Sequence, residues 1–180
     1  MDNDSAQKHR RLDQVLAPDF SADLESFGLD ELRRRRDLAD EVETELSYYR
    51  RLLHGRLDLL AFEQRRRRGE EQRSLIEALP EILVGRERTG GGSARHLSTE
   101  LPPLPVRGRR TVDRVLGSDL MVRLPELTTE DLAEASVELA EVEAELSMTR
   151  IKVQAVLDRL QAEVVSRYKH DLGDPALHST

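Results

Sequence analysis

The chain has 180 residues, and its 35 Asp and Glu residues outnumber its 28 Lys and Arg residues, which gives a formal net charge of −7. Aromatic residues make up only 3% of the chain, and cysteine and tryptophan are absent. The length allows one domain with a tail. The absence of cysteine excludes disulfide scaffolds, thiolate metal sites and thiol catalysis. High charge with few aromatic residues favours helices that carry a narrow apolar stripe over a thick globular core.

The sequence also limits the location of the protein and its reaction class. No run of about 18 apolar residues is present to span a membrane. The first residues lack the apolar segment of a signal peptide, so we expect a cytoplasmic protein with no membrane partner. The five histidines do not have the spacing of metal ligands. No set of residues suggests a nucleophile with its base, so we expect neither a metal site nor an enzyme.

Residues 1–28 are polar, mixed in charge and interrupted by Pro18. We interpret them as an N-terminal arm with one turn near Ser21–Phe27. A long helix is then predicted over residues 29–68, because its apolar residues recur in the heptad pattern of a coiled-coil seam. The seam residues are Leu32, Ala39, Val42, Leu46, Tyr49, Leu53 and Leu60. Gly69 is the expected stop of this helix.

A long connector covers residues 69–127. A weaker, short helix is predicted within residues 70–84, interrupted by Pro80, and another is expected around Val112–Leu116. Between them lie a Gly-rich segment and an extended Pro-rich segment. A connector of this length is either disordered or used for function, and we expect it to be partly ordered.

A second long helix is predicted over residues 128–171, with Thr128 or Thr129 as its N-cap. It has the same heptad pattern as the first long helix. Its seam residues are Leu132, Ala135, Leu139, Val142, Leu146, Val153, Val156 and Leu160. Residues 172–180 form a polar C-terminal tail.

The two long helices repeat one polar pattern at a fixed offset of 100 residues, E-x3-S-x2-R-x3-[H/Q]-x3-D. Its members are Glu43, Ser47, Arg50, His54 and Asp58 in the first helix and Glu143, Ser147, Arg150, Gln154 and Asp158 in the second. Spacings of three and four keep each set on one stripe of its helix, beside the apolar seam. Two plainer explanations remain open: polar remnants of a duplication, and a rim of pairs within each helix.

The repeat has a consequence for the orientation of the helices. If both stripes serve one site, the two-fold axis is perpendicular to the helices, so the helices are antiparallel and the ligand is itself two-fold symmetric. Arginine can bind guanine or phosphate bidentately, and a carboxylate can accept from the N–H groups of guanine, so a symmetric guanine dinucleotide fits. The predicted fold is therefore all-α, an antiparallel two-helix coiled-coil hairpin whose long connector contains short helices.

The pattern of the second helix, from Glu143 to Asp158, resembles the cyclic-di-GMP signature of the actinobacterial RsiG family of anti-sigma factors. The resemblance covers both long helices, and the chain departs from the family pattern at His54, where the family has Gln. It implies an antiparallel coiled coil with one motif per helix that binds cyclic-di-GMP as an intercalated dimer. When loaded, such a protein holds the sporulation sigma factor WhiG inactive. The resemblance implies that the arginines engage guanine or phosphate, that the glutamates accept from guanine, and that the other members complete a polar cage.

Two other interpretations remain open. The protein is a structural or scaffolding coiled coil without a small ligand, or its arginine runs at residues 33–36 and 65–68 contact nucleic acid. Consecutive residues of a helix point in different directions, and acidic neighbours partly neutralise both runs, so we expect no direct DNA binding.

A second stripe of apolar residues lies beside the seam, and we expect it to be buried by the helix within residues 70–84 or by a partner protein. Its members are Tyr48, Leu52, Leu59, Phe62, Met148, Ile151, Ala155 and Ala162.

Overall fold

The computed structural model describes residues 10–84 and 123–173. The Gly- and Pro-rich linker, the helix expected around Val112–Leu116 and the end of the C-terminal tail lie outside these residues. The chain divides into two compact units. Unit 1 combines Met1–Ser47 with Met148–Thr180, and unit 2 is Tyr48–Ser147.

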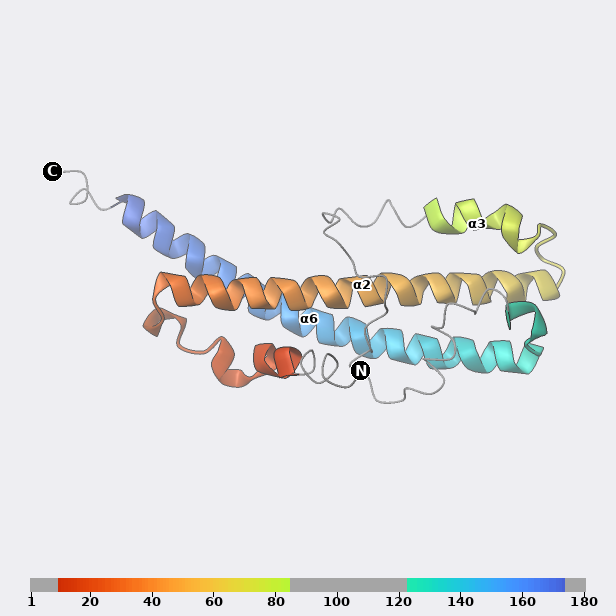
Figure 1. The fold of residues 1–180 in the computed structure, drawn as a ribbon, viewed down its shortest axis with the longest axis horizontal. Helices are drawn as coiled ribbons and strands as arrows, with labels where there is room; N and C mark the ends of the chain where they lie inside the picture. Colours follow the sequence, from red (N-terminus) through yellow and green to blue (C-terminus); the bar gives the residue numbers. More distant parts are fainter. Residues whose placement is uncertain (1–9, 85–122, 174–180) are drawn as a thin grey trace. The chain divides into compact units, whose positions relative to one another are not determined.

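Every regular element in the described residues is helical, which confirms the predicted fold class (Figure 1). Besides a helical stretch at residues 10–16, the α-helices are α2 (Leu29–Arg67), α3 (Leu75–Val84) and α6 (Thr129–Gly173). The short 3-10 turns are η1 (Pro18–Phe20), η2 (Leu24–Ser26) and η4 (Leu124–Glu126). The two long helices are each continuous and contribute residues to both units.

The end of α2 is fixed by a glycine with a left-handed backbone. Gly69 has a φ of 76°, and its N–H donates to the carbonyl of Arg66 at 3.1 Å. The N–H of Glu70 donates to the carbonyl of Arg65 at 3.0 Å. These two bonds form a Schellman motif, which satisfies carbonyls that the helix end leaves without partners. The expected stop at Gly69 is therefore confirmed.

The starts of α3 and α6 are fixed by capping boxes. Ser74 and Glu77 exchange side-chain and backbone hydrogen bonds at the start of α3, with distances of 2.7 and 3.3 Å. Thr128 and Asp131 do the same before α6, at 3.1 and 3.0 Å. Each box satisfies two backbone donors that a helix start leaves unpaired. The sequence predicts a helix interrupted at Pro80, whereas α3 contains Pro80 and continues to Val84.

The long helices pack antiparallel in each unit. In unit 1, Arg33 near the start of α2 donates to the hydroxyl of Tyr168 near the end of α6, at 3.0 Å. In unit 2, Gln64 near the end of α2 donates to the backbone carbonyl of Leu132 and to the hydroxyl of Ser136, both near the start of α6. The predicted antiparallel pairing is therefore confirmed.

The heptad seam forms the core of each unit. In unit 1 the buried apolar residues are Val15, Phe20, Leu32, Ala39, Val42, Leu46, Val153, Leu160 and Val164. In unit 2 they are Tyr49, Leu53, Leu59, Leu60, Phe62, Ala78, Leu124, Leu132, Ala135, Leu139, Val142 and Leu146. Every predicted seam residue is buried apart from Val156, which is half-buried. Burial of this seam is the main force that joins the two helices.

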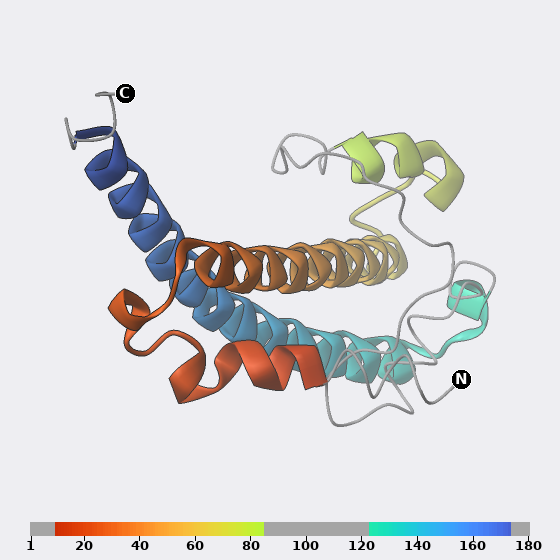
Figure 2. The same cartoon turned by 60° about the vertical axis from the view of Figure 1, so that its left-hand side comes forward.

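The N-terminal segment has more structure than a polar arm with one turn. Residues 10–16 are helical, and the side chains of Val15 and Phe20 are buried in unit 1. The guanidinium of Arg159, on α6, donates to the backbone carbonyl of Ser21 at 2.6 Å. These contacts attach the segment, red in Figure 2, to the helices of unit 1.

The second apolar stripe is covered unevenly. On α2, Leu59 and Phe62 are buried, and Tyr48 and Leu52 are half-buried. On α6, Met148 and Ile151 are 62% and 61% exposed, and Ala155 and Ala162 are also exposed. The protein therefore buries much of the stripe on α2 itself, whereas the stripe on α6 stays exposed.

Candidate functional site

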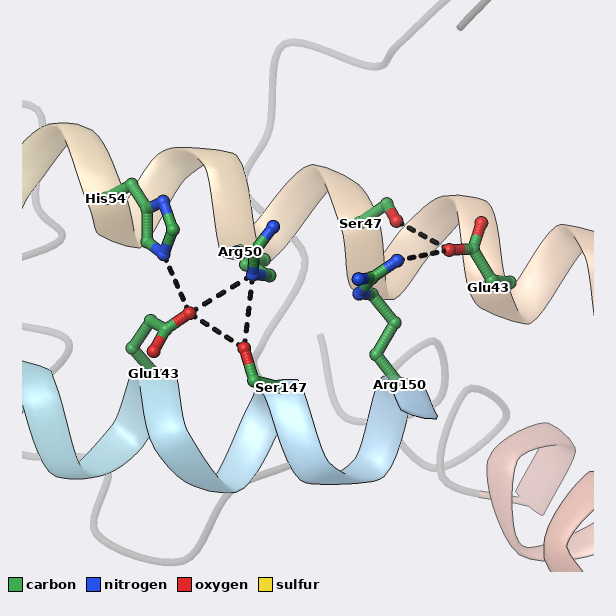
Figure 3. A network of polar contacts seen from close by, with 7 residues as sticks. All are labelled: Glu43, Ser47, Arg50, His54, Glu143, Ser147 and Arg150. Atoms are coloured by element: carbon green, nitrogen blue, oxygen red, sulfur yellow. Dashed lines mark hydrogen bonds and ion pairs between the residues drawn. The ribbon is translucent and has the colours of Figure 1, made fainter. Parts of the chain in front are cut away.

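The first group of motif residues lies in unit 1 and is centred on Glu43. The Oε1 atom of Glu43 accepts from the hydroxyl of Ser47 at 2.8 Å, one turn further along α2. The same oxygen accepts from Nη1 of Arg150 at 2.9 Å and from Nε2 of Gln154 at 3.1 Å, both on α6. We call these four residues the Glu43 cluster (Figure 3, where Gln154 is not drawn).

The second group lies in unit 2 and is centred on Glu143. Its Oε1 atom accepts from the hydroxyl of Ser147 at 2.7 Å, one turn further along α6. The same oxygen accepts from Nε of Arg50 at 3.2 Å and lies 2.7 Å from Nε2 of His54, both on α2. Arg50 also donates to the Ser147 hydroxyl at 3.1 Å. These four residues form the Glu143 cluster, which Figure 3 also shows.

Each cluster draws on both copies of the repeat. The Glu and Ser come from one helix, and the Arg and the Gln or His come from the other helix. The sequence pattern groups the residues of one helix into one half-site, whereas the structure divides each copy between two clusters. The antiparallel packing explains this division, because it reverses the order of the second copy relative to the first within the pair.

Both clusters keep polar atoms available for a further partner. Neither Glu43 nor Glu143 uses its second carboxylate oxygen, Oε2, in a hydrogen bond to the residues that the structure describes. The glutamate side chains are 18% and 20% exposed. Arg50 binds through Nε and leaves its two terminal nitrogens free of described partners. Arg150 binds through Nη1 and leaves Nη2 free of described partners, while its Nε is buried without a hydrogen-bond partner. Each cluster thus retains an acceptor and several donors.

Two predicted members of the motif stand apart from the clusters. Asp58 and Asp158 are exposed, and within residues 10–84 and 123–173 neither makes a hydrogen bond or an ion pair. Without these aspartates, each cluster holds one carboxylate and one guanidinium. Their formal charges sum to zero, in the Glu143 cluster for a neutral His54. Each copy of the motif has a formal charge of −1, from two carboxylates and one guanidinium, but the cluster itself does not carry this charge.

The electrostatics of the Glu143 cluster favour an ionised carboxylate. Burial opposes ionisation and is the largest single influence on Glu143. The hydrogen bonds from Ser147 and His54, together with the nearby charge of Arg50, outweigh it. The pKa of Glu143 consequently lies below its ordinary value of 4.5. Glu143 is therefore an anion at neutral pH and acts as a fixed acceptor.

The arginine runs make local pairs. In the first run, Arg35 donates to Glu31 and to the carbonyl of Phe20, both at 2.7 Å. In the second run, Arg66 and Arg67 bind the buried carboxylate of Glu63, at 2.7 and 2.8 Å. Arg68 binds the neighbouring Glu70 at 2.7 Å. Contacts with the protein's own acidic groups therefore occupy much of both runs, which weakens the interpretation as a nucleic-acid surface.

The bond from Arg159 to Ser21 was not foreseen from the sequence. A side chain that donates to a backbone carbonyl far away in sequence leaves no pattern that spacing reveals. The structure uses Arg159 to attach the N-terminal segment to α6. Its guanidinium is therefore committed to packing.

Two features are absent from the described part of the chain. No group of three or more His, Asp or Glu side chains in residues 10–84 and 123–173 is placed to hold a metal ion. No helix in the same residues combines the length and the apolar character needed to cross a membrane.

The fold and the clusters define a class of protein: an antiparallel helix pair with one polar cluster, built from a duplicated motif, in each unit. Within this class, residues 18–83 match the family described as RsiG-like. The match contains the first copy of the motif, from Glu43 to Asp58, and it confirms the resemblance found in the sequence. The match covers less than half of the chain, and similarity to this family suggests an anti-sigma factor role. No curated protein matches the chain.

Proposed function

We propose that the protein is a cytoplasmic anti-sigma factor whose activity is controlled by cyclic-di-GMP. The two clusters bind the ligand, as a dimer of cyclic-di-GMP molecules, and the loaded protein sequesters a sporulation-type sigma factor such as WhiG. We propose, in line with the resemblance to the actinobacterial family, that the protein comes from an actinobacterium. The observation that carries the proposal is the pair of matching clusters, in each of which three donors converge on one glutamate oxygen.

The free atoms of the clusters suit guanine and phosphate. The unused Oε2 of each glutamate is an acceptor for the N1–H and N2–H groups of guanine. The unused terminal nitrogens of Arg50 and Arg150 are donors for guanine O6 and N7 or for a phosphate oxygen. Three hydrogen bonds hold each glutamate in place before the ligand arrives, so little conformational entropy remains to be lost on binding. We place Asp58 and Asp158 at the edges of the ligand face.

The clusters also offer a way for the ligand to change the helix pair. In each unit, the ion pair between Glu and Arg joins α2 to α6. A ligand that binds both partners adds further bridges between the helices and stabilises one packing arrangement. It favours the sigma-binding state only by the difference between its affinities for the two states. The sigma factor then meets a surface whose geometry the ligand has fixed.

The first test is isothermal titration calorimetry of the chain with cyclic-di-GMP, with cyclic-di-AMP and GTP as specificity controls. We expect selective binding of about two cyclic-di-GMP molecules per chain, as the two-fold repeat implies. Arg150→Ala removes charged hydrogen bonds and should weaken binding about 10- to 150-fold. Arg36→Ala is the matched control, because Arg36 pairs with the adjacent Asp37 on the surface and should leave binding unchanged.

Binding of all three nucleotides with equal affinity contradicts the proposal, and so does full affinity in the Arg150→Ala variant. If the free chain binds nothing, the titration is repeated in the presence of a purified sporulation-type sigma factor. A second absence of binding rejects the sensor function.

A scaffolding coiled coil is the second candidate, and one observation favours it. Each cluster already joins α2 to α6 through an ion pair between its own residues, as a contact that only aligns the helices would. Replacing both Arg50 and Arg150 with Ala discriminates between the two functions. If the protein is a scaffold, the double variant should bind its partner as the wild type does, with or without cyclic-di-GMP. If it is a sensor, the double variant should lose the binding of the sigma factor that depends on cyclic-di-GMP.

A further inference from the structure

The two clusters differ in one residue type. The Glu43 cluster has Gln154 where the Glu143 cluster has His54. His54 Nε2 lies 2.7 Å from Oε1 of Glu143, and that carboxylate is ionised at neutral pH. Two acceptors at this distance need a proton between them. The proton must therefore sit on Nε2, so the neutral ring of His54 is the Nε2–H tautomer.

This tautomer determines what His54 presents to a ligand. Its other nitrogen, Nδ1, makes no hydrogen bond to any residue in the two described segments, and the side chain is 41% exposed. In the neutral ring Nδ1 is an acceptor, and in the protonated ring it is a donor. Gln154 uses its NH₂ group on Glu43 and leaves its amide oxygen, which is an acceptor at every pH.

The charges around His54 set the effect of its protonation. Glu143 faces it from α6, and Arg50 on its own helix shares the same carboxylate oxygen. Asp58, one turn further along α2, is exposed and contacts none of the described residues. Protonation of the ring therefore changes the cluster from neutral to a charge of +1. In the Glu43 cluster the equivalent position is Gln154, whose amide carries no titratable proton.

We propose that His54 couples ligand recognition at the Glu143 cluster to proton uptake, so that the two clusters bind a cyclic dinucleotide with different pH dependence. The protonated ring donates Nδ1–H to an acceptor on the ligand, either a phosphate oxygen or guanine O6 or N7. Affinity therefore rises as the pH falls toward 6. This inference rests on the proposed function, since it concerns the same ligand site.

The test is a titration of the full chain with cyclic-di-GMP at about pH 6 and about pH 8, a range that brackets imidazole ionisation. Wild-type affinity should be at least about threefold higher at the lower pH. His54→Gln makes the clusters identical in type, so it should bind at both pH values with affinities within about twofold of each other. Gln154→His introduces a second imidazole and should increase the pH dependence.

Nuclear magnetic resonance of the imidazole nitrogens in the ligand-free chain provides a second readout. We expect the Nε2–H tautomer of His54 at about pH 8. The Nδ1–H tautomer overturns the inference and leaves the proposed function intact, and so does ligand binding that is independent of pH. An equal pH dependence in wild type and His54→Gln also overturns it. If the chain binds no cyclic-di-GMP at any pH, either alone or with the purified sigma factor, the proposed function and the inference both fail.

Discussion

The Glu43 and Glu143 clusters have the same arrangement of hydrogen bonds, but the helix that provides the acceptor and the helix that provides the donors are exchanged. In the Glu43 cluster, α2 provides the acceptor and α6 the cross-helix donors, and in the Glu143 cluster the reverse holds. The arginines differ in detail, since Arg150 binds through a terminal nitrogen and Arg50 through Nε. The comparison shows that a duplicated motif on antiparallel helices pairs each copy with the other. Each cluster therefore depends on both helices.

Replacing the leucine beside each cluster should have the largest effect. Leu46 and Leu146 are equivalent in the repeat, and they are 3% and 1% exposed. Leu46→Ala and Leu146→Ala should each lower the free energy of unfolding by about 2–5 kcal/mol, because each leaves a cavity in the seam. Urea denaturation followed by circular dichroism measures the loss. A cost below about 1 kcal/mol for either variant contradicts the packing described for that unit.

Removing the charge of each central glutamate should have a smaller effect. Glu43→Gln and Glu143→Gln leave three donors facing a weaker, neutral acceptor, so each should cost about 1–2 kcal/mol. The control is Glu141→Gln on the exposed face of α6, which should change stability by less than about 0.5 kcal/mol. If the two cluster variants cost no more than the control, the clusters do not join the helices.

Acid should reveal the Glu143 contribution separately. Its pKa is lowered in the folded chain, so the unfolded chain takes up the proton first as the pH falls. The stability from this carboxylate is complete above its ordinary pKa of 4.5 and is lost as the pH falls through the lower folded value. The difference in unfolding free energy between wild type and Glu143→Gln should therefore shrink below about pH 4.5. A difference that grows in acid contradicts the assigned direction.

The smallest effect is expected outside the clusters. Arg36 lies in an arginine run and binds the adjacent Asp37 on the surface. Arg36→Ala should change the unfolding free energy by less than about 0.5 kcal/mol, since exposed ion pairs contribute little. The nucleic-acid alternative is supported instead if the wild-type chain binds duplex DNA at low salt and Arg36→Ala does not.

The core could be predicted from the sequence because its residues obey a strict period. The heptad seam from Leu32 to Leu60 and the repeat from Leu132 to Leu160 follow directly from burial on one side of a helix. The stop at Gly69 is also visible, since glycine adopts the left-handed backbone at little cost.

The rest depends on contacts that leave no local pattern. Val15 and Phe20 are buried in a segment too short and too polar to show a periodicity. The bond from Arg159 to the Ser21 carbonyl joins positions 138 residues apart. The ten motif residues were visible through the offset of the repeat, but their division into two mixed clusters depends on the register of the helices. That register places His54 rather than Asp58 on Glu143.

The central claim is that the clusters form a ligand face and do more than align the helices. The most direct test exchanges the charges of one cluster, Glu43→Arg with Arg150→Glu, and measures both unfolding free energy and cyclic-di-GMP affinity. The exchange keeps an ion pair between α2 and α6 but reverses the donors and acceptors offered to the ligand. We predict stability within about 1 kcal/mol of wild type and an affinity at least about tenfold weaker. Unchanged affinity in this folded variant contradicts the account.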